Sequence, residues 1–243
     1  MVLSRLMLNL RHKRTQSELA RPYELHRTIM SAFPAELDGD RVLFRPEIDE
    51  RSGALRVIVQ SATQPDWSRL AAQPGYLQRP PESKTIALTL IEGQVLAFRL
   101  RANPTVKKAT HDEKPVAHPG WLAARREQER QGIKPSGGNG IRLGIKDEKG
   151  QLEWLNRKGE QSGFRVLKVQ VRPEGLQVSH KRDSASTKHV GHRMAHLAVT
   201  FDGLLQVTDP ERLRAAVAGG IGSAKALGFG LLSLAPPPQG END

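Results

Sequence analysis

One stretch near the start of the chain decides the fold class: residues 2–33, with the sequence VLSRLMLNLRHKRTQSELARPYELHRTIMSAF. Leucines occupy every second position toward the end of 2–10, and this alternation is typical of a strand. Pro22 suits the first position of a helix, where its missing N–H costs nothing, and Leu25 and Ile29 then recur at helical spacing. The stretch therefore predicts a strand followed by a helix that begins near Pro22.

The segments that follow extend this pair of elements into a known order. Two apolar runs, 41–46 and 55–61, indicate strands on either side of a turn at 51–53. A weaker helix is expected within 65–77, and another strand within 95–101. The resulting order of strand, helix, strand, strand, helix and strand is the ferredoxin-like order, which many RNA-binding domains share.

The second half of the chain predicts a further unit of the same kind. Charge, glycine and proline dominate 105–150, and regular patterns return after it. The expected elements are a helix at 151–157, a strand at 164–171, a hairpin of 175–180 with 194–201, a helix at 209–218 and a strand at 229–234. We therefore expect an α+β fold of two tandem ferredoxin-like (RRM-like) domains, with antiparallel sheets and helices on one face. The expected boundaries are 1–104 and 105–235, with a mobile loop at 131–150 and a disordered tail at 236–243.

The charge balance favours a polyanionic partner. The 243 residues include 37 Lys and Arg against 26 Asp and Glu, which gives a formal net charge of +11. Nucleic acid is the first partner that such a field suggests, and an anionic membrane surface is the second. Only 5% of the residues are aromatic, which argues against a broad stacking platform for single-stranded nucleic acid.

Cysteine content and hydropathy indicate the compartment. No cysteine is present, which excludes disulfides and thiolate metal sites and is compatible with a reducing environment. No segment approaches the roughly 18 consecutive apolar residues of a membrane-spanning helix, and the first residues lack the features of a secretory signal. A cytoplasmic protein is therefore expected.

Tyr23 and His26 are the strongest candidates for acid–base chemistry. They lie three residues apart on the expected helix and share a face, which points away from Leu25 and Ile29. An unperturbed histidine titrates near pH 6.5, and the free N–H groups at a helix start attract anions. Arg27 adds a cation beside them, so a phosphate could meet a proton shuttle and a hydroxyl donor here. The alternative is a surface pair without chemistry, because such pairs are common.

A glycine-rich segment lies between the last helix and the last strand, at 218–230, with the sequence AGGIGSAKALGFG. Neither a Walker loop nor a dinucleotide fingerprint fits its spacing. One interpretation is a backbone surface at Gly220 and Gly222 that is pressed against a polynucleotide, with Lys225 on a phosphate. The other interpretation is tight packing of the segment against the first domain.

Two further basic features could contact a nucleic acid backbone. Arg99 and Arg101 fall on the outward face of their strand, opposite its apolar face. The link between the hairpin strands, 181–193, contains more cations, of which the candidate RNA contacts are Lys181, Arg182 and Lys188. Ordinary solvated charge is the alternative for both features.

Four histidines lie close together in the sequence, but a metal site is not expected among them. They are His180, His189, His192 and His196. Neither a cysteine nor a carboxylate at ligand-like spacing accompanies them. Because no carboxylate set suits two-metal cleavage of a phosphodiester either, we expect neither a metal nor a cofactor.

Three motifs, in order along the chain, resemble those of a known family. They are PYELHR at 22–27, FRLRANP at 98–104 and GSAKALGFGLLS at 222–233. Together with the opening strand they are similar to the CRISPR-associated repeat endoribonucleases of the type I-E system, the CasE (Cse3) family. The resemblance spans about residues 2–235, except for 105–163.

The resemblance implies metal-independent cleavage of a hairpin in CRISPR repeat RNA, with the family's catalytic Tyr and His at Tyr23 and His26. The implied reaction is attack of a ribose 2′-hydroxyl on the neighbouring phosphate, which leaves 2′,3′-cyclic phosphate and 5′-hydroxyl ends. The resemblance also implies that the mature crRNA stays bound and that the protein joins the Cascade complex. The sequence leaves open which of the two residues is the acid and which is the base.

Two other functions remain open from the residues alone. A non-catalytic RNA-binding subunit of a ribonucleoprotein complex would use the same basic surface. A basic protein associated with ribosomes or membranes could carry the Tyr–His pair by chance.

Overall fold

The computed structural model describes residues 1–37, 39–48, 53–108, 141–181 and 192–238. The chain divides into two compact units, of which one is Met1–Pro104 together with Lys146–Asp243 and the other is Thr105–Ile145. Among the described helices, none is long and apolar enough to cross a membrane.

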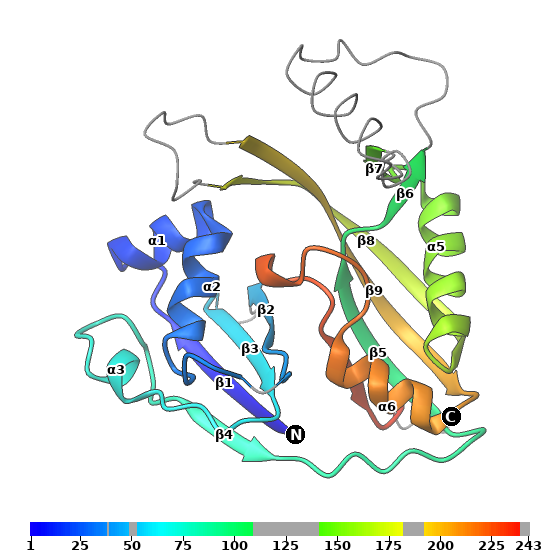
Figure 1. Ribbon diagram of the computed structural model, residues 1–243, viewed down its shortest axis with the longest axis horizontal. Coiled ribbons are helices and arrows are strands. Elements are labelled where there is room, and N and C mark those ends of the chain that lie inside the picture. The colour runs from blue at the N-terminus through cyan, green and yellow to red at the C-terminus, as the bar shows by residue number, and fades with distance from the viewer. Residues whose placement is uncertain (38, 49–52, 109–140, 182–191, 239–243) are drawn as a thin grey trace, which may run out of the picture. The chain divides into compact units, whose positions relative to one another are not determined.

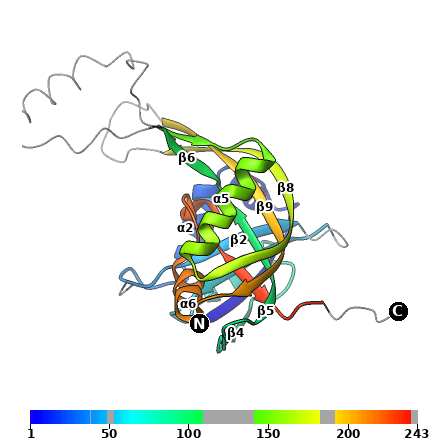
Figure 2. The same cartoon turned by 90° about the vertical axis from the view of Figure 1, so that its right-hand side faces the viewer.

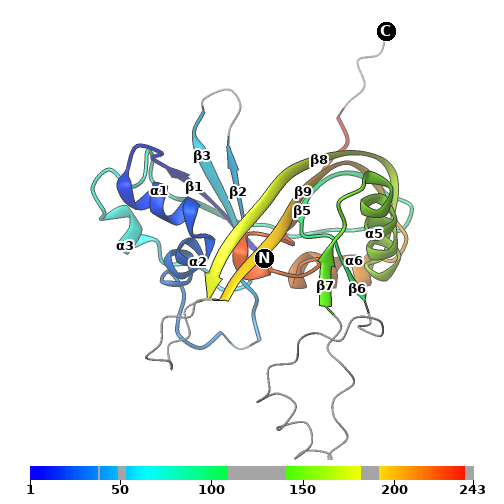
Figure 3. The same cartoon turned by 90° about the horizontal axis from the view of Figure 1, so that it is seen from above.

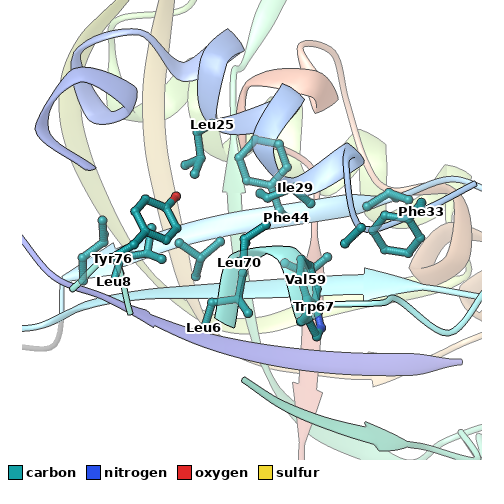
Figure 4. Packing of buried hydrophobic residues seen from close by; sticks show 14 residues of the cluster. Leu6, Leu8, Leu25, Ile29, Phe33, Phe44, Val59, Trp67, Leu70 and Tyr76 are labelled. Carbon is teal, nitrogen blue, oxygen red and sulfur yellow. The ribbon is translucent and has the colours of Figure 1, made fainter. Parts of the chain in front are cut away.

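The first unit contains two antiparallel sheets, and the first of these has the strand order β2-β3-β1-β4. Its strands are β1 (Val2–Leu8), β2 (Leu43–Ile48), β3 (Leu55–Ser61) and β4 (Glu82–Thr85), and the helices between them are α1 (Lys13–Ala20), α2 (Pro22–Met30) and α3 (Ser68–Ala71). Helices α1 and α2 lie over one face of this sheet (Figure 1). Leu25 and Ile29 of α2 form one buried cluster with Leu6, Phe44 and Val59 of the sheet, which fixes the orientation of the helix (Figure 4).

The second sheet repeats this arrangement with the order β10-β5-β9-β8. Its strands are β5 (Val95–Ala102), β8 (Phe164–Lys181), β9 (His192–Val207) and β10 (Leu232–Ala235), and the helices are α5 (Glu148–Gln161), α6 (Pro210–Gly219) and the short 3-10 helix η1 (Lys225–Leu227). Helices α5 and α6 cover one face of the sheet (Figure 2). The predicted fold of two tandem ferredoxin-like units is therefore confirmed.

One predicted strand belongs to the other sheet. The sequence analysis uses 95–101 as the last strand of the first unit, but β5 pairs with β9 and β10. The fourth strand of the first sheet is β4, whose side chains are all exposed. A strand without buried side chains carries no apolar alternation, so the sequence gives no signal for it. The predicted division of the chain into domains at residue 104 stays a prediction.

Part of the predicted loop at 131–150 is regular structure. Strand β7 (Ile141–Gly144) pairs with β6 (Thr105–Lys108) in the second unit. Helix α5 begins before residue 150, because the Asp147 side chain caps it by accepting a hydrogen bond from the Gly150 N–H. The first turn of α5 is polar and its buried residues begin at Gln151, so the sequence pattern reveals only the later turns. Residues 131–140 of the loop and 239–243 of the tail lie outside the described residues.

The predicted hairpin of the second half is longer than expected. β8 and β9 pair from Phe164 opposite Val207 to Lys181 opposite His192. The far end of this ribbon extends toward α2, and β8 contacts α2 (Figure 3). The hairpin and the helix that carries the Tyr–His pair therefore belong to one region of the molecule.

Candidate active site

Helix α2 presents Tyr23 and His26 on a face that the sheet does not cover. Pro22 stands at the helix start, as predicted, and the burial of Leu25 and Ile29 turns the opposite face outward. The Tyr23 side chain is 47% exposed. Its ring centroid lies 5.9 Å from that of His26, with the two ring planes tilted by 42°. The predicted pairing of a phenol with an imidazole is therefore confirmed.

The His26 imidazole is held against the core at the edge of the first sheet. It stacks on the Phe44 ring, with a centroid distance of 6.1 Å and an angle of 17° between the planes. Its Nδ1 atom is buried and has no hydrogen-bond partner among the described residues. Burial lowers the pKa of His26 below its ordinary value near 6.5, because the charged form loses hydration. The ring is therefore neutral at pH 7, and Nε2 is the nitrogen left to accept a proton from a ligand.

The glycine-rich segment packs against the first sheet. At Gly220, where φ is +72°, an added Cβ would lie 2.8 Å from a Leu43 methyl carbon. At Gly228, where φ is +83°, it would lie 2.8 Å from Cδ of Pro46. At Gly222 it would meet the Trp154 ring at 3.2 Å. Of the two interpretations of this segment, tight packing explains the glycines, and contact of Gly220 and Gly222 with a polynucleotide stays a prediction.

This packing brings Lys225 into the region of α2, because η1 contacts both α2 and β2. Burial is the main cause that lowers the pKa of Lys225, and repulsion by Arg41 and Lys158 adds to it. Arg41 and Lys158, from two other parts of the chain, therefore act electrostatically on Lys225. A phosphate at this position would relieve their repulsion, next to a neutral imidazole and a phenol. Arg41 and Lys158 are not identifiable as site residues from the sequence, because their proximity to Lys225 arises only from the tertiary fold.

Arg99 and Arg101 lie at alternate positions of β5, as predicted, and both form ion pairs within the protein, while their contacts with RNA stay predictions. Arg101 is only 8% exposed and pairs with Glu174 at 2.7 Å. Arg99 pairs with Asp202 at 2.5 Å, on the neighbouring strand β9. Strand β9, next to β5, supplies Asp202, and β8, one strand further, supplies Glu174, which a single strand's sequence cannot reveal. Both guanidinium groups are engaged within the protein.

Arg101 also contacts the glycine-rich segment, at Gly228 and Phe229. Its guanidinium donates a hydrogen bond to the Gly228 carbonyl at 3.3 Å and lies 4.5 Å from the centroid of the Phe229 ring. The neighbouring backbone N–H of Gly230 donates to the Arg101 carbonyl at 2.7 Å. Arg101 therefore positions the segment that carries Lys225.

Of the remaining predicted cations, only Arg27 has a described side chain. Arg27 is exposed beside the Tyr–His pair and makes a loose contact of 3.4 Å with Glu24. The Lys181 backbone ends strand β8, but its side chain is not described, and Arg182 and Lys188 lie outside the described residues. Their contacts with RNA stay predictions.

One of the four clustered histidines has a described side chain, His196. Its Nδ1 lies 3.2 Å from the Asn103 amide nitrogen, and its ring packs near Phe229 at 6.3 Å between centroids. Burial lowers the pKa of His196, as it does for His26. In the described part of the chain, no three side chains of metal-ligating type form a group that could hold an ion.

The chain is similar over most of its length to two named proteins and to a solved structure. The chain is 36% identical to the CRISPR-associated endoribonuclease Cse3 of Thermus thermophilus, over 97% of this chain and 100% of that protein. It is 30% identical to the CRISPR system Cascade subunit CasE of Escherichia coli, over 88% of this chain and 92% of that one. A solved structure of Cse3 bound to a 19-nucleotide RNA superposes with a TM-score of 0.74 at 34% identity, over 97% of this chain and 100% of that one.

The match to a family model is equally extensive. The model described as CRISPR associated protein covers residues 1–236, which include both sheets, the Tyr–His pair and the glycine-rich segment. With this coverage and these relatives, the chain belongs to the CRISPR-associated protein family that contains Cse3 and CasE.

Proposed function

We propose that this protein is a metal-independent endoribonuclease that binds and cleaves hairpin-containing CRISPR repeat RNA. The observation that carries the proposal is the neutral, partly buried His26 beside Tyr23, in the region that η1 and Lys225 adjoin. The relatedness to Cse3, which is named an endoribonuclease and is solved with RNA bound, supports the substrate class.

The reaction is an attack of a ribose 2′-hydroxyl on the adjacent phosphorus. The bond from O2′ to phosphorus forms, the bond from phosphorus to O5′ breaks, and the products carry 2′,3′-cyclic phosphate and 5′-hydroxyl ends. His26 accepts the proton of the 2′-hydroxyl, because its lowered pKa keeps Nε2 unprotonated at pH 7. Tyr23 donates its hydroxyl proton to the departing O5′, and the proton on His26 then restores the phenol by way of solvent.

Lys225 stabilises the negative charge that accumulates on the phosphate during this step. Its partial burial makes the interaction with an anion stronger than it would be in water. Arg41 and Lys158 add to the same field, and Arg27 holds the adjacent backbone. All proton transfers are thus assigned to side chains, so the reaction needs no metal-bound water.

The RNA contacts extend from this centre along two further elements. Lys181, at the end of β8, and Arg182 and Lys188 of the sequence that follows contact the groove of the hairpin stem, where backbone contacts dominate in A-form RNA. The Gly220 and Gly222 backbone follows the strand next to the scissile phosphate. Arg99 and Arg101 contribute indirectly, by fixing the sheet and the segment behind it.

After cleavage the protein retains the mature crRNA hairpin and joins the Cascade complex. The retained product makes the same stem contacts as the substrate, so cleavage costs little of the binding energy. The relative CasE is named a Cascade subunit, which supports this partner. The activity belongs in the cytoplasm, where the repeat transcripts are made.

Cleavage and binding assays on a repeat hairpin test the proposal. His26→Ala is expected to abolish cutting while hairpin binding persists, and the wild-type protein is expected to cut in EDTA. A 2′-deoxy nucleotide before the scissile phosphate should block cutting, whereas the same change one nucleotide away should not. Cutting that survives both His26→Ala and the 2′-deoxy substitution would refute the mechanism. Tight binding without any cutting by the wild-type protein would identify a non-catalytic RNA-binding subunit instead.

A further inference from the structure

A cavity borders α2 on the face next to Arg27. It is enclosed by α1, α2 and the segment from α3 to Pro74, and its volume is about 720 Å³. This size is in the ordinary range for a ligand site. Polar side chains dominate its lining, including Arg14, Ser17, Arg21, Arg27, Arg69 and Gln73.

The cavity has more positive charge than its own carboxylates neutralise. Arg14 is paired with the buried Glu18 at 2.7 Å, so its charge is offset. Arg69 is exposed and has no ion-pair or hydrogen-bond partner among the described residues. Among the described residues, the Arg21 guanidinium bonds only to the neutral hydroxyl of Ser17. Arg21 and Arg69 are therefore available to bind an anion.

The helix geometry connects this cavity to the Tyr–His pair. At about 100° per residue around α2, His26 lies about 60° to one side of Tyr23, and Arg27 lies about 40° to the other. Glu24 and Thr28, which line the cavity, lie about 100° and 140° from Tyr23 on the side of Arg27. The order around the helix is therefore His26, Tyr23, Arg27 and then the cavity.

This order indicates which way the RNA strand runs across α2. The indication rests on the proposed function, because it uses the roles assigned to His26 and Tyr23. His26 acts at the 2′-hydroxyl, which precedes the scissile phosphate, and Tyr23 acts at O5′, which follows it. A strand that passes from His26 to Tyr23 continues over Arg27 and into the cavity. We propose that the cavity is a second RNA site, which binds a backbone phosphate of the single strand on the 3′ side of the cleavage position.

The lining fits a phosphodiester of RNA. Two arginines present planar forks that match phosphate oxygens, and both are exposed enough to reach a passing strand. The Gln73 side-chain oxygen accepts a bond from Arg14 at 2.8 Å, which leaves its amide N–H groups to donate to phosphate or to a ribose hydroxyl. The site would then strengthen binding of the substrate and release its hold once the 3′ strand departs.

The experiment compares two RNAs that share the hairpin. The longer RNA continues for several nucleotides past the cleavage position and carries a 2′-deoxy nucleotide that prevents cutting. The shorter RNA ends at the cleavage position, like the product. Dissociation constants are measured over a range of salt concentrations for the wild-type protein, the double variant Arg21→Ala/Arg69→Ala and the control Arg79→Ala. Arg79 is exposed in a neighbouring segment and does not line the cavity.

The double variant is expected to bind the longer RNA about tenfold more weakly, with the slope of log K against log[salt] reduced by about 0.7 for each lost contact. Its affinity for the shorter RNA and both affinities of Arg79→Ala should match the wild type. Equal losses for the two RNAs, or no loss for either, would overturn the proposal. A variant that binds both RNAs normally but fails to assemble with Cascade subunits would assign the cavity to an acidic protein surface instead. The proposed function is judged separately, by whether the wild-type protein cuts the all-ribose form of the longer RNA.

Discussion

The imidazole of His26 lies nearly parallel to the phenyl ring of Phe44, at 6.1 Å between ring centroids. Phe44 is fully buried in the core of the first sheet. His26, to which we assign the proton transfer, is therefore supported by the same cluster that holds α2 in place. The Nδ1 atom is buried without a hydrogen-bond partner among the described residues, and burial lowers the pKa of the ring.

Cleavage should remain fast at moderately acidic pH. The base must be neutral to accept a proton, and the pKa of His26 lies below its ordinary value of about 6.5. The rate should therefore hold through pH 6.5 and fall only as the pH drops through the lower pKa of the folded protein. Single-turnover cleavage rates from pH 5 to 8 measure this fall, which is the acidic limb of the pH–rate profile. An acidic limb centred above 6.5 would contradict the assignment of His26 as a buried base.

Phe44→Leu should raise the pH at which the cleavage rate begins to fall, which moves the acidic limb of the profile toward higher pH. The smaller side chain keeps an apolar contact but uncovers the flat face of the imidazole, so the charged form regains hydration. The variant should also lose roughly 1 to 2 kcal/mol of unfolding free energy, because the core loses volume. Urea unfolding and the pH profile are measured on the same preparation. A pH profile identical to wild type, in a folded variant, would mean that the stack does not set the pKa.

Lys225→Gln should slow the chemical step far more than it weakens binding. The amine is the cation that η1 brings to the region of α2, and removing one preorganised charge contact typically costs about 10²-fold in rate. Single-turnover rates at saturating protein separate chemistry from affinity. Lys149→Gln is a suitable control, because Lys149 is exposed in the first turn of α5. Equal effects of the two substitutions would remove Lys225 from the mechanism.

Two glycine substitutions nine residues apart should behave in opposite ways. Gly228→Ala combines a φ of +83° with a Cβ only 2.8 Å from Pro46, so it should destabilise the protein by about 3 kcal/mol. Gly219→Ala meets no atom within 4 Å and ends helix α6, so it should be neutral or stabilising by about 0.5 kcal/mol. Urea denaturation midpoints compare the two. Equal stabilities would show that the close approach to β2 carries no strain.

The sequence predicts the parts of this molecule that local periodicity determines. The helix that begins at Pro22 buries Leu25 and Ile29, so the placement of Tyr23 and His26 on one outward face follows from helical spacing. Most strands of both sheets are likewise visible as apolar runs. The family resemblance adds what spacing cannot supply, namely the RNA substrate and the type of reaction.

The errors arise where an element depends on distant partners. Strand β4 is polar and exposed, so only its pairing with β1 identifies it as a strand. Arg101 looks like a surface cation until Glu174, 73 residues later in the chain, is placed beside it. The group formed by Lys225, Arg41 and Lys158 has the same origin, since no sequence window contains it. Long-range pairing is the information that a single sequence lacks.

The close fit of Gly220 on Leu43 and of Gly228 on Pro46 joins the two ferredoxin-like parts, each of which carries some of the residues to which we assign catalysis. His26 and Tyr23 come from the amino-terminal ferredoxin-like unit, and Lys225 comes from the carboxyl-terminal one. Neither half could cut RNA after severance from its counterpart. The proposed activity therefore requires that the glycine-rich segment stay packed against β2.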